Sequence, residues 1–147
     1  MKFTCNTREL SSACQTVARA AATRSSAPAL EGIKIAAADG AVSLCGYNLE
    51  IGITTQIDPE SVAECGSIVL NAKTLCGIVR KLPGGVFEIG TDGKNNATIV
   101  SGDARYEIVG MPASDYPEIP GVGESKQAEI PQPTLKDMIG QTAFAID

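Results

Sequence analysis

The sequence predicts an α+β fold in which one β-α-β-β-β unit occurs twice. The first observation behind this prediction is a repeated start. Phe3 and Ile68 each open a short apolar stretch that leads through an asparagine into an amphipathic segment of the same spacing. The second is that alternating apolar residues with Gly-containing turns follow each segment. A weaker third start is present at Glu129-Ile130. Repeats of this kind usually build an extended or ring-shaped surface rather than one catalytic pocket.

The first unit is predicted to open with a strand over residues 2–5 and to continue into a helix. Asn6 is a favourable N-cap, and Glu9 three positions later completes the pattern of a capping box. The apolar side chains of this helix recur with helical period on one stripe: Leu10, Ala13, Cys14, Val17, Ala18 and Ala21. Residues 23–28 are predicted to form a loop, because Pro28 biases the residue before it away from helix.

Three strands are predicted to complete the first unit. Ile33 begins the first of them, and Asp39-Gly40 is a strong hairpin signal. The alternation continues over residues 42–44 on the returning strand and over residues 51–57 on the third strand. The polar residues 58–66, which include a proline, are predicted to be a connection without regular structure.

The second unit repeats this order from Ser67 onward. Its helix is predicted from about Ala72 to Leu82, where Pro83-Gly84-Gly85 ends it. The apolar stripe of this helix consists of Leu75, Ile78, Val79 and Leu82. Its strands are predicted at residues 86–89, 97–101 and 104–109. We expect both helices to pack side by side on the inner faces of antiparallel sheets, with the sheets outside.

Residues 110–125 are predicted to be a linker because they contain three prolines and three glycines. A strand near 127–131 and a helix beginning after Thr134 are predicted to follow. We therefore expect residues 1–120 to form one domain, and residues 121–147 to be a linker plus the first strand and helix of an incomplete second domain. On this interpretation the chain is a truncated fragment, and its last segment packs poorly on the first domain.

Composition argues against several classes of protein. Hydrophobic residues make up 44% of the 147 residues and charged residues 20%, which is typical of a globular protein. No apolar run approaches the ~20 residues of a membrane-spanning helix, and the N-terminus lacks the apolar core of a signal peptide, so we expect a cytoplasmic protein without membrane contact. The five cysteines form no Cys-x-x-Cys pair and histidine is absent. Neither a metal site nor a cofactor is therefore expected.

No catalytic motif is present in the sequence. Gly84-Gly85 follows a predicted helix, whereas a phosphate-binding loop follows a strand and opens a helix. The predicted turn that begins at Asp92 lacks the ligand order of a calcium-binding loop. A Gly-x-Ser-x-Gly segment, which would hold a nucleophilic serine, does not occur. We therefore predict no catalytic residue.

Basic residues gather on the predicted helices of a protein whose net charge is −5. One side of the second helix carries Lys73, Gly77, Arg80 and Lys81, and the corresponding side of the first carries Arg8, Ser12, Gln15 and Arg19. Phosphate backbone is the natural ligand of such a surface. Neither side holds an aromatic residue, so base stacking is not expected. For either helix alone, a solvated polar face remains the alternative.

A set of ordered motifs carries a family resemblance. These are Met1-Lys2-Phe3-Thr4, Pro28-x-Leu30-x-Gly32, Asp39-Gly40-x-Val42-x-Leu44-x-Gly46, Asn48-Leu49-Glu50 and Met111-Pro112-Ala113-Ser114-Asp115-Tyr116-Pro117. Together they resemble the bacterial sliding clamps, the beta subunits of DNA polymerase III. The resemblance implies domains of two β-α-β-β-β units each, and two subunits that close head to tail into a ring around duplex DNA. Helices would then line the hole and sheets the outer wall.

The resemblance also implies a non-catalytic processivity factor of DNA replication that needs no cofactor. The residues it implies at duplex DNA are Arg24, Lys73 and Arg80, with Arg8, Arg19 and Lys81 behind them. The strand near 104–109 is implied at the subunit interface of the dimer, through Arg105, Tyr106 and Ile108. In the family, the pocket for polymerase and clamp-loader peptides lies between the second and third domains, so it is expected outside this chain.

Two other functions remain open at this point. The chain could be a structural repeat module whose helix charges only keep it soluble, or a small hydrolase with an unrecognised site. A clamp requires Arg24, Lys73 and Arg80 to share one concave face, whereas a structural module would scatter them. A hydrolase requires a deep pocket lined by convergent polar groups.

Overall fold

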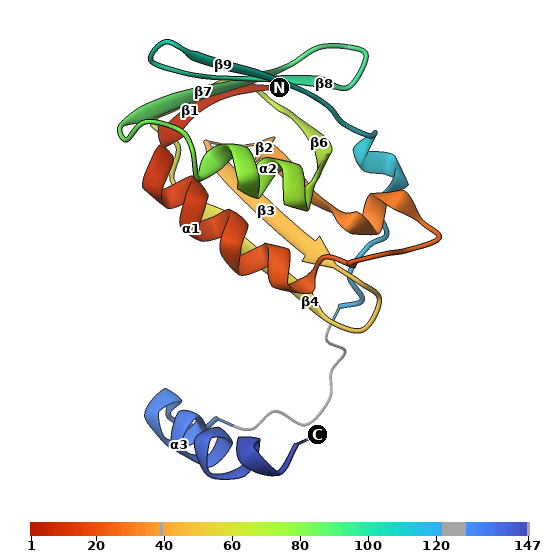
Figure 1. The fold of residues 1–147 in the computed structure, drawn as a ribbon, viewed down its shortest axis with the longest axis vertical. Helices are drawn as coiled ribbons and strands as arrows, with labels where there is room; N and C mark the ends of the chain where they lie inside the picture. The colour runs from red at the N-terminus through yellow and green to blue at the C-terminus, as the bar shows by residue number, and fades with distance from the viewer. Residues whose placement is uncertain (39, 122–128, 147) are drawn as a thin grey trace.

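A computed structural model describes residues 1–38, 40–121 and 129–146 of the chain. Two antiparallel sheets and a pair of adjacent helices make up most of residues 1–116 (Figure 1). The two adjacent helices are α1 (Thr7–Val17) and α2 (Ala72–Val79). The first sheet, in the order β5-β1-β7-β8-β9, consists of Ser61–Glu64, Lys2–Asn6, Val86–Thr91, Asn96–Ser101 and Ala104–Val109. The second, in the order β4-β3-β2-β6, consists of Gly52–Ile57, Ala41–Tyr47, Gly32–Ala38 and Gly66–Asn71.

The opening strand of each unit belongs to the sheet of the other unit. β1 pairs with β7, so that Phe3 lies opposite Ile89. β6 pairs with β2, so that Ile68 lies opposite Ile35. Each helix therefore connects one sheet to the other, and both sheets share one apolar core with both helices. Within this core the rings of Phe3 and Phe87 meet edge to face at 6.1 Å between centroids.

The repeated start predicted from the sequence is confirmed in the side chains. Asn6 accepts a hydrogen bond from the amide of Arg8 at 2.9 Å, and Asn71 accepts one from the amide of Thr74 at 3.1 Å, so each asparagine caps its helix. Among the described residues, Glu9 does not complete the predicted capping box. The buried members of the two predicted stripes are Leu10, Ala13, Cys14, Val17, Leu75, Val79 and Leu82.

The second helix is shorter than the sequence predicts. It ends at Val79 rather than at Leu82, and Pro83 has no N–H to donate the next helical hydrogen bond to the carbonyl of Val79. The chain continues as tighter turns, in which the amide of Lys81 donates to the carbonyl of Ile78 at 2.8 Å. Ile78 itself, predicted to be buried, is partly exposed and packs against the edge of the core.

The segment predicted as an irregular connection, residues 58–66, contains the strand β5. Val62 lies opposite Phe3 in the pairing of β5 with β1, and its side chain packs against the core. It is the one apolar residue of this strand that is not exposed. A single half-buried residue between exposed neighbours gives a weak alternation, and the sequence prediction therefore missed this edge strand.

The first part of the predicted linker belongs to the domain. Met111 exchanges two backbone hydrogen bonds with Val69, at 2.8 and 3.0 Å. The short 3-10 helix Ala113–Asp115 then directs Tyr116 into a small second cluster of buried side chains. The glycines and prolines predicted a linker, but residues 110–116 form a turn that is anchored to the second sheet.

Tyr116→Phe is expected to lower the free energy of unfolding by about 1 kcal/mol. The hydroxyl of Tyr116 lies 3.3 Å from the carbonyl oxygen of Cys45 and 3.4 Å from that of Gly32, and the side chain is only 4% exposed. Chemical denaturation measures the loss. Tyr106→Phe is the matched control, because its hydroxyl makes no hydrogen bond among the described residues. A loss no larger than that of the control would contradict the role given to this hydroxyl.

The same substitution should also change how stability depends on pH. Burial raises the pKa of the Tyr116 hydroxyl. The unfolded chain releases this proton at the ordinary value, so the contribution of Tyr116 is complete below that pH and declines as the pH rises towards the folded value. Tyr116→Phe should remove this alkaline decline.

The C-terminal helix α3 (Gln132–Thr142) begins earlier than predicted. Residues 129–131, the described part of the strand predicted near 127–131, are not in a strand, and residues 127–128 lie outside the described residues. The helix buries none of its side chains, and exposed apolar residues of this segment are Leu135, Met138, Ile139, Phe144 and Ile146. This agrees with the expectation that the segment packs poorly on the first domain. None of the helices in the described parts of the chain is both long and apolar enough to span a membrane.

Candidate nucleic-acid interface

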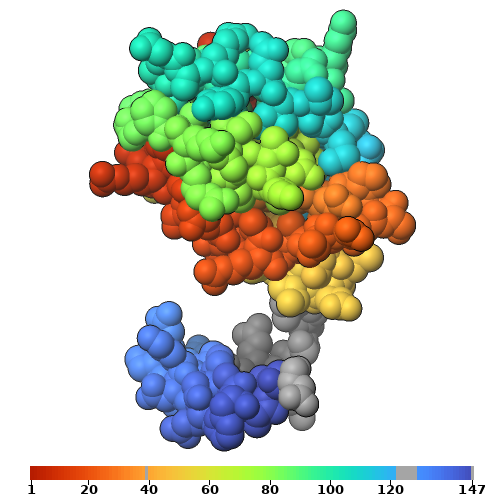
Figure 2. All heavy atoms as spheres, in the orientation of Figure 1, coloured from red at the N-terminus to blue at the C-terminus, as the bar shows by residue number. Residues whose placement is uncertain are grey.

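α1 and α2 lie side by side and run in opposite directions. Figure 2 shows them next to each other on one face, α1 in red and α2 in green. The start of α1 meets the chain after α2, since the amide and the hydroxyl of Thr7 donate to the carbonyl of Gly85 at 2.8 and 2.9 Å. A groove of about 330 Å³ lies between the chain after α1 and one side of α2, and its lining extends from Asn71 to Arg80.

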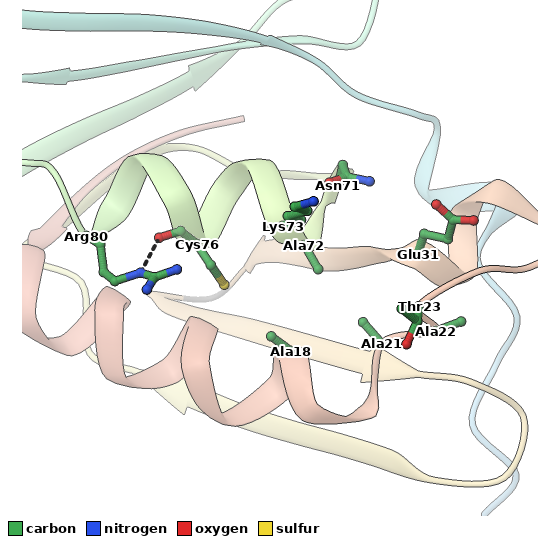
Figure 3. Close-up of a pocket in the computed structure, with 10 residues that line it drawn as sticks. All are labelled: Ala18, Ala21, Ala22, Thr23, Glu31, Asn71, Ala72, Lys73, Cys76 and Arg80. Atoms are coloured by element: carbon green, nitrogen blue, oxygen red, sulfur yellow. Dashed lines mark hydrogen bonds between the residues drawn. The ribbon is translucent and has the colours of Figure 1, made fainter.

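Two of the cations predicted to face DNA line this groove. Lys73 borders it from α2, Arg80 from the residue that follows α2, and Thr23 from the loop after α1 (Figure 3). Arg24 follows Thr23 directly and is exposed. The other side chains that line the groove are mostly small: Ala18, Ala21, Ala22, Ala72 and Cys76. Of the three cations that the clamp hypothesis places on one concave face, Lys73 and Arg80 line this groove and Arg24 does not.

The N-cap of α2 fixes the residue at which the helix begins, and thereby the side of the helix on which Lys73 and Arg80 lie. Asn71 accepts hydrogen bonds from both the amide and the hydroxyl of Thr74, which starts the helix at Ala72. Lys73 and Arg80 are then two turns apart on the same side of the helix. The Nε of Arg80 donates to the carbonyl of Cys76 at 3.5 Å. Arg80 lies at the C-terminal end of α2, where the helix dipole favours a cation.

Glu31 is a groove residue that sequence reasoning missed. Its carboxylate accepts a hydrogen bond from the amide of Ser25 at 3.0 Å, and its side chain lines the same groove as Lys73. This bond fixes the loop that carries Arg24. The 3-10 helix Pro28–Glu31 turns the chain back towards that loop. No spacing rule connects a loop amide with a carboxylate six residues later, so the sequence offered no signal for it.

The remaining predicted cations lie outside the groove. Arg8, Arg19 and Lys81 are exposed, but none of them lines it. Arg8 lies in the first turn of α1 and Lys81 just after α2, and the contact of Thr7 with Gly85 brings these two ends together. The six predicted cations thus spread along the helix pair, and two of them share the groove.

The cations of the helix pair are available to an external anion. Among the described residues, none of the six takes part in an ion pair. The side-chain ion pairs found there lie on the first sheet: Lys2 with Glu88 at 3.2 Å and Arg105 with Glu107 at 3.1 Å. No aromatic side chain lines the groove. The surface is therefore suited to screened contacts with phosphate and not to base stacking.

The three residues predicted at the subunit interface differ in their burial within this domain. Ile108 is only 6% exposed and belongs to the core of its own domain, and Tyr106 packs partly against that core. Because side chains alternate along β9, the residues it exposes are Arg105, Glu107 and Val109. β9 is the last strand of its sheet, so its backbone edge is available to a partner.

Comparison with known protein families identifies the family of this chain. The model of the N-terminal domain of DNA polymerase III beta subunits matches residues 1–120. The chain belongs to this family. The beta sliding clamp of Bacillus subtilis (strain 168) is 37% identical over 153 residues, which cover 99% of the chain and 40% of that protein. The chain thus spans about two fifths of the length of this beta subunit.

Solved structures of beta subunits confirm the fold class. The sliding clamp from Bacillus subtilis superposes with a TM-score of 0.91 and 36% identity, covering 100% of this chain and 40% of that one. The DNA polymerase III beta subunit from Pseudomonas aeruginosa gives a TM-score of 0.92 at 27% identity, with the same coverage. The α+β fold of paired β-α-β-β-β units, predicted from the repeated start, is that of the beta subunits.

Proposed function

We propose that this chain provides the first domain of a ring-shaped sliding clamp that encircles duplex DNA and tethers a DNA polymerase for processive synthesis. Residues 1–120 form that domain, and residues 121–147 contain a linker and the beginning of a second one. The role is non-catalytic and needs no cofactor or metal. The protein acts in the cytoplasm, where bacterial DNA is replicated.

The observation that carries this proposal is the groove between the helices, in a member of the beta subunit family. Lys73 and Arg80 lie on it without an ion pair among the described residues, and Arg24 adjoins it. Arg8, Arg19 and Lys81 extend the positive charge along the helix pair. Contacts of this kind are weak, exchange with water and do not depend on sequence, so a clamp that makes them can slide.

The proposal includes a head-to-tail homodimer. The exposed edge of β9, with Arg105 and Tyr106, is the part of this domain that adds to the sheet of a neighbouring subunit. Polymerase and clamp-loader subunits bind the assembled ring through a pocket outside this chain. The ion pair of Arg105 with Glu107 leaves the cation exposed, so a carboxylate of the partner can take the place of Glu107.

Changing Lys73 and Arg80 together to glutamate in the full-length protein should impair loading onto primed circular DNA and shorten the products of the tethered polymerase. The charge reversal replaces attraction to phosphate by repulsion, while both side chains lie outside the core. Lys34→Glu with Lys94→Glu is the matched control, because it reverses two cations away from the helix groove. Size-exclusion chromatography checks that the ring forms. Normal loading and processivity at low salt, with an intact ring, would refute the DNA-facing assignment.

A further inference from the structure

Among the described residues, Glu31 is the one acidic side chain that lines the groove between the helices. It shares this lining with Lys73 and Arg80, and Figure 3 shows it at the opposite end of the groove from Arg80. On charge alone, a carboxylate near these cations lowers the attraction of the groove for phosphate. The hydrogen bonds of the loop after α1 give Glu31 a second effect, which has the opposite sign.

The loop after α1 is held at both of its ends. The amide of Ala22 donates to the carbonyl of Leu30 at 2.8 Å, and the amide of Leu30 donates to the carbonyl of Ala27 at 3.0 Å. Leu30 is only 2% exposed and belongs to a buried cluster against which Ala22 and Ala27 also pack. Residues 23–26 therefore bridge two fixed points, and the buried Leu30 directly precedes Glu31 in the chain.

Between these two points, Glu31 makes the contact that holds the loop. Its Oε1 accepts a hydrogen bond from the amide of Ser25 at 3.0 Å, and the hydroxyl oxygen of Ser25 accepts one from the amide of Ala27 at 3.1 Å. In the described part of the chain, no other hydrogen bond connects residues 23–26 to the chain beyond the loop. Without this carboxylate, the segment that carries Arg24 would be tethered only at its ends.

We propose that Glu31 is a positioning residue that holds Arg24 beside the groove for contact with a DNA phosphate. The inference rests on the proposed function, because it assumes that the groove faces duplex DNA. A loop that is fixed in advance loses little conformational entropy when its cation meets a phosphate, whereas a free loop loses it on binding. The hydrogen bond of Glu31 supplies this effect, and its charge does not. An amide oxygen accepts the same hydrogen bond, so glutamine keeps the positioning and removes the opposing charge.

The test compares Glu31→Ala with Glu31→Gln in the full-length ring. The affinity for a short linear duplex is measured by fluorescence anisotropy between about 50 and 200 mM salt. Glu31→Ala should weaken binding several-fold and reduce the salt slope by about 1 for each subunit, as Arg24→Ala does. Glu31→Gln should bind at least as tightly as the unchanged ring. Charge alone predicts tighter binding for both variants, so unchanged or tighter binding by Glu31→Ala would overturn the proposal.

Glu9 provides the matched control. It lies on α1 outside the groove, and its side chain makes no hydrogen bond among the described residues. Glu9→Ala and Glu9→Gln remove the same charge and should therefore change the affinity in the same direction. Opposite effects of these two variants would show that the contrast between alanine and glutamine does not report the hydrogen bond to Ser25, and would overturn the proposal.

A double variant tests whether Glu31 acts through Arg24. Glu31→Ala combined with Arg24→Ala should bind DNA no more weakly than Arg24→Ala alone, because the cation that Glu31 positions is already absent. A further loss of affinity in the double variant would show that Glu31 acts on another part of the surface, and its role as the positioning residue of Arg24 would be wrong.

Failure of this inference and failure of the proposed function give different results. Normal binding and loading by the ring with Lys73→Glu and Arg80→Glu would overturn both. Weakened binding by that ring, together with an unchanged affinity of the Glu31→Ala ring, would overturn the positioning role alone.

A measurement on the unchanged chain keeps the proposal testable if Glu31→Ala fails to fold. Amide hydrogen exchange, followed by NMR for each residue, should be slower at Ser25 than at Arg24 and Ser26, whose amides make no hydrogen bond among the described residues. Exchange at Ser25 as fast as at its two neighbours would show that the carboxylate of Glu31 does not hold the loop, and would refute the inference.

Discussion

Replacing Leu75 by alanine is expected to lower the free energy of unfolding by about 2–5 kcal/mol. Leu75 is 0% exposed and packs in the core that α2 shares with both sheets. Removing its side chain loses the transfer free energy of the buried atoms and leaves a cavity that the surrounding strands close only in part. Leu10 holds the corresponding position in the first unit and is equally buried, so Leu10→Ala should cost a similar amount.

Denaturation in urea, followed by circular dichroism, measures this loss. Ile78→Ala is the internal comparison, because the sequence pattern assigned Ile78 to the same stripe while the structure leaves it partly exposed. Ile78→Ala should lower the free energy of unfolding by less than Leu75→Ala does. If Ile78→Ala destabilised the chain as much as Leu75→Ala, the orientation of α2 described here would be wrong.

Gly46→Ala should also destabilise the domain strongly, by about 3 kcal/mol. Gly46 lies in β3 where the end of α1 crosses the sheet. A Cβ at this position would collide with the carbonyl oxygen of Val17 and lie 2.9 Å from its carbonyl carbon. Both clashing atoms belong to the backbone, so relief requires the end of α1 to move away from the sheet. Because the loop with Arg24 follows α1, the groove should be distorted as well.

The matched control for this substitution is Gly77→Ala in α2. A Cβ at Gly77 meets nothing within 4 Å, and alanine favours helix, so this change should raise the free energy of unfolding by about 0.5–1 kcal/mol. The pair is compared by urea denaturation under one set of conditions. A neutral Gly46→Ala would mean that α1 does not approach β3 as closely as described.

The parts of the fold that local signals control were predictable. Asn6 and Asn71 predicted the starts of the two helices. The alternation of apolar and polar residues predicted most of the strands, because each of these strands buries one face. The strand β5 was not predictable, since Val62 is its one apolar residue that is not exposed. The pairing of β1 with β7 could not be predicted from the sequence, for a different reason. Nothing in either strand specifies a partner so far away in the chain, and only the shared core decides it.

The candidate site also contains residues that local spacing predicts and residues that depend on how distant segments pack. Helical spacing places Lys73 and Arg80 on one side of α2, which the structure confirms. The opposite wall of the groove depends on how the chain after α1 packs, so Thr23 and Glu31 could not be inferred from pattern.

The pairing of β1 with β7 has a consequence for synthesis on the ribosome. At roughly 5–20 residues per second, on the order of ten seconds pass between the addition of Phe3 and that of Ile89, its partner across the sheet. β5 is made earlier and covers only one edge of β1. β2 likewise lacks β6 until the second unit begins. The first half of the domain therefore leaves the ribosome with open strand edges that only the second half closes, and in that interval it is exposed to pairing with other nascent chains.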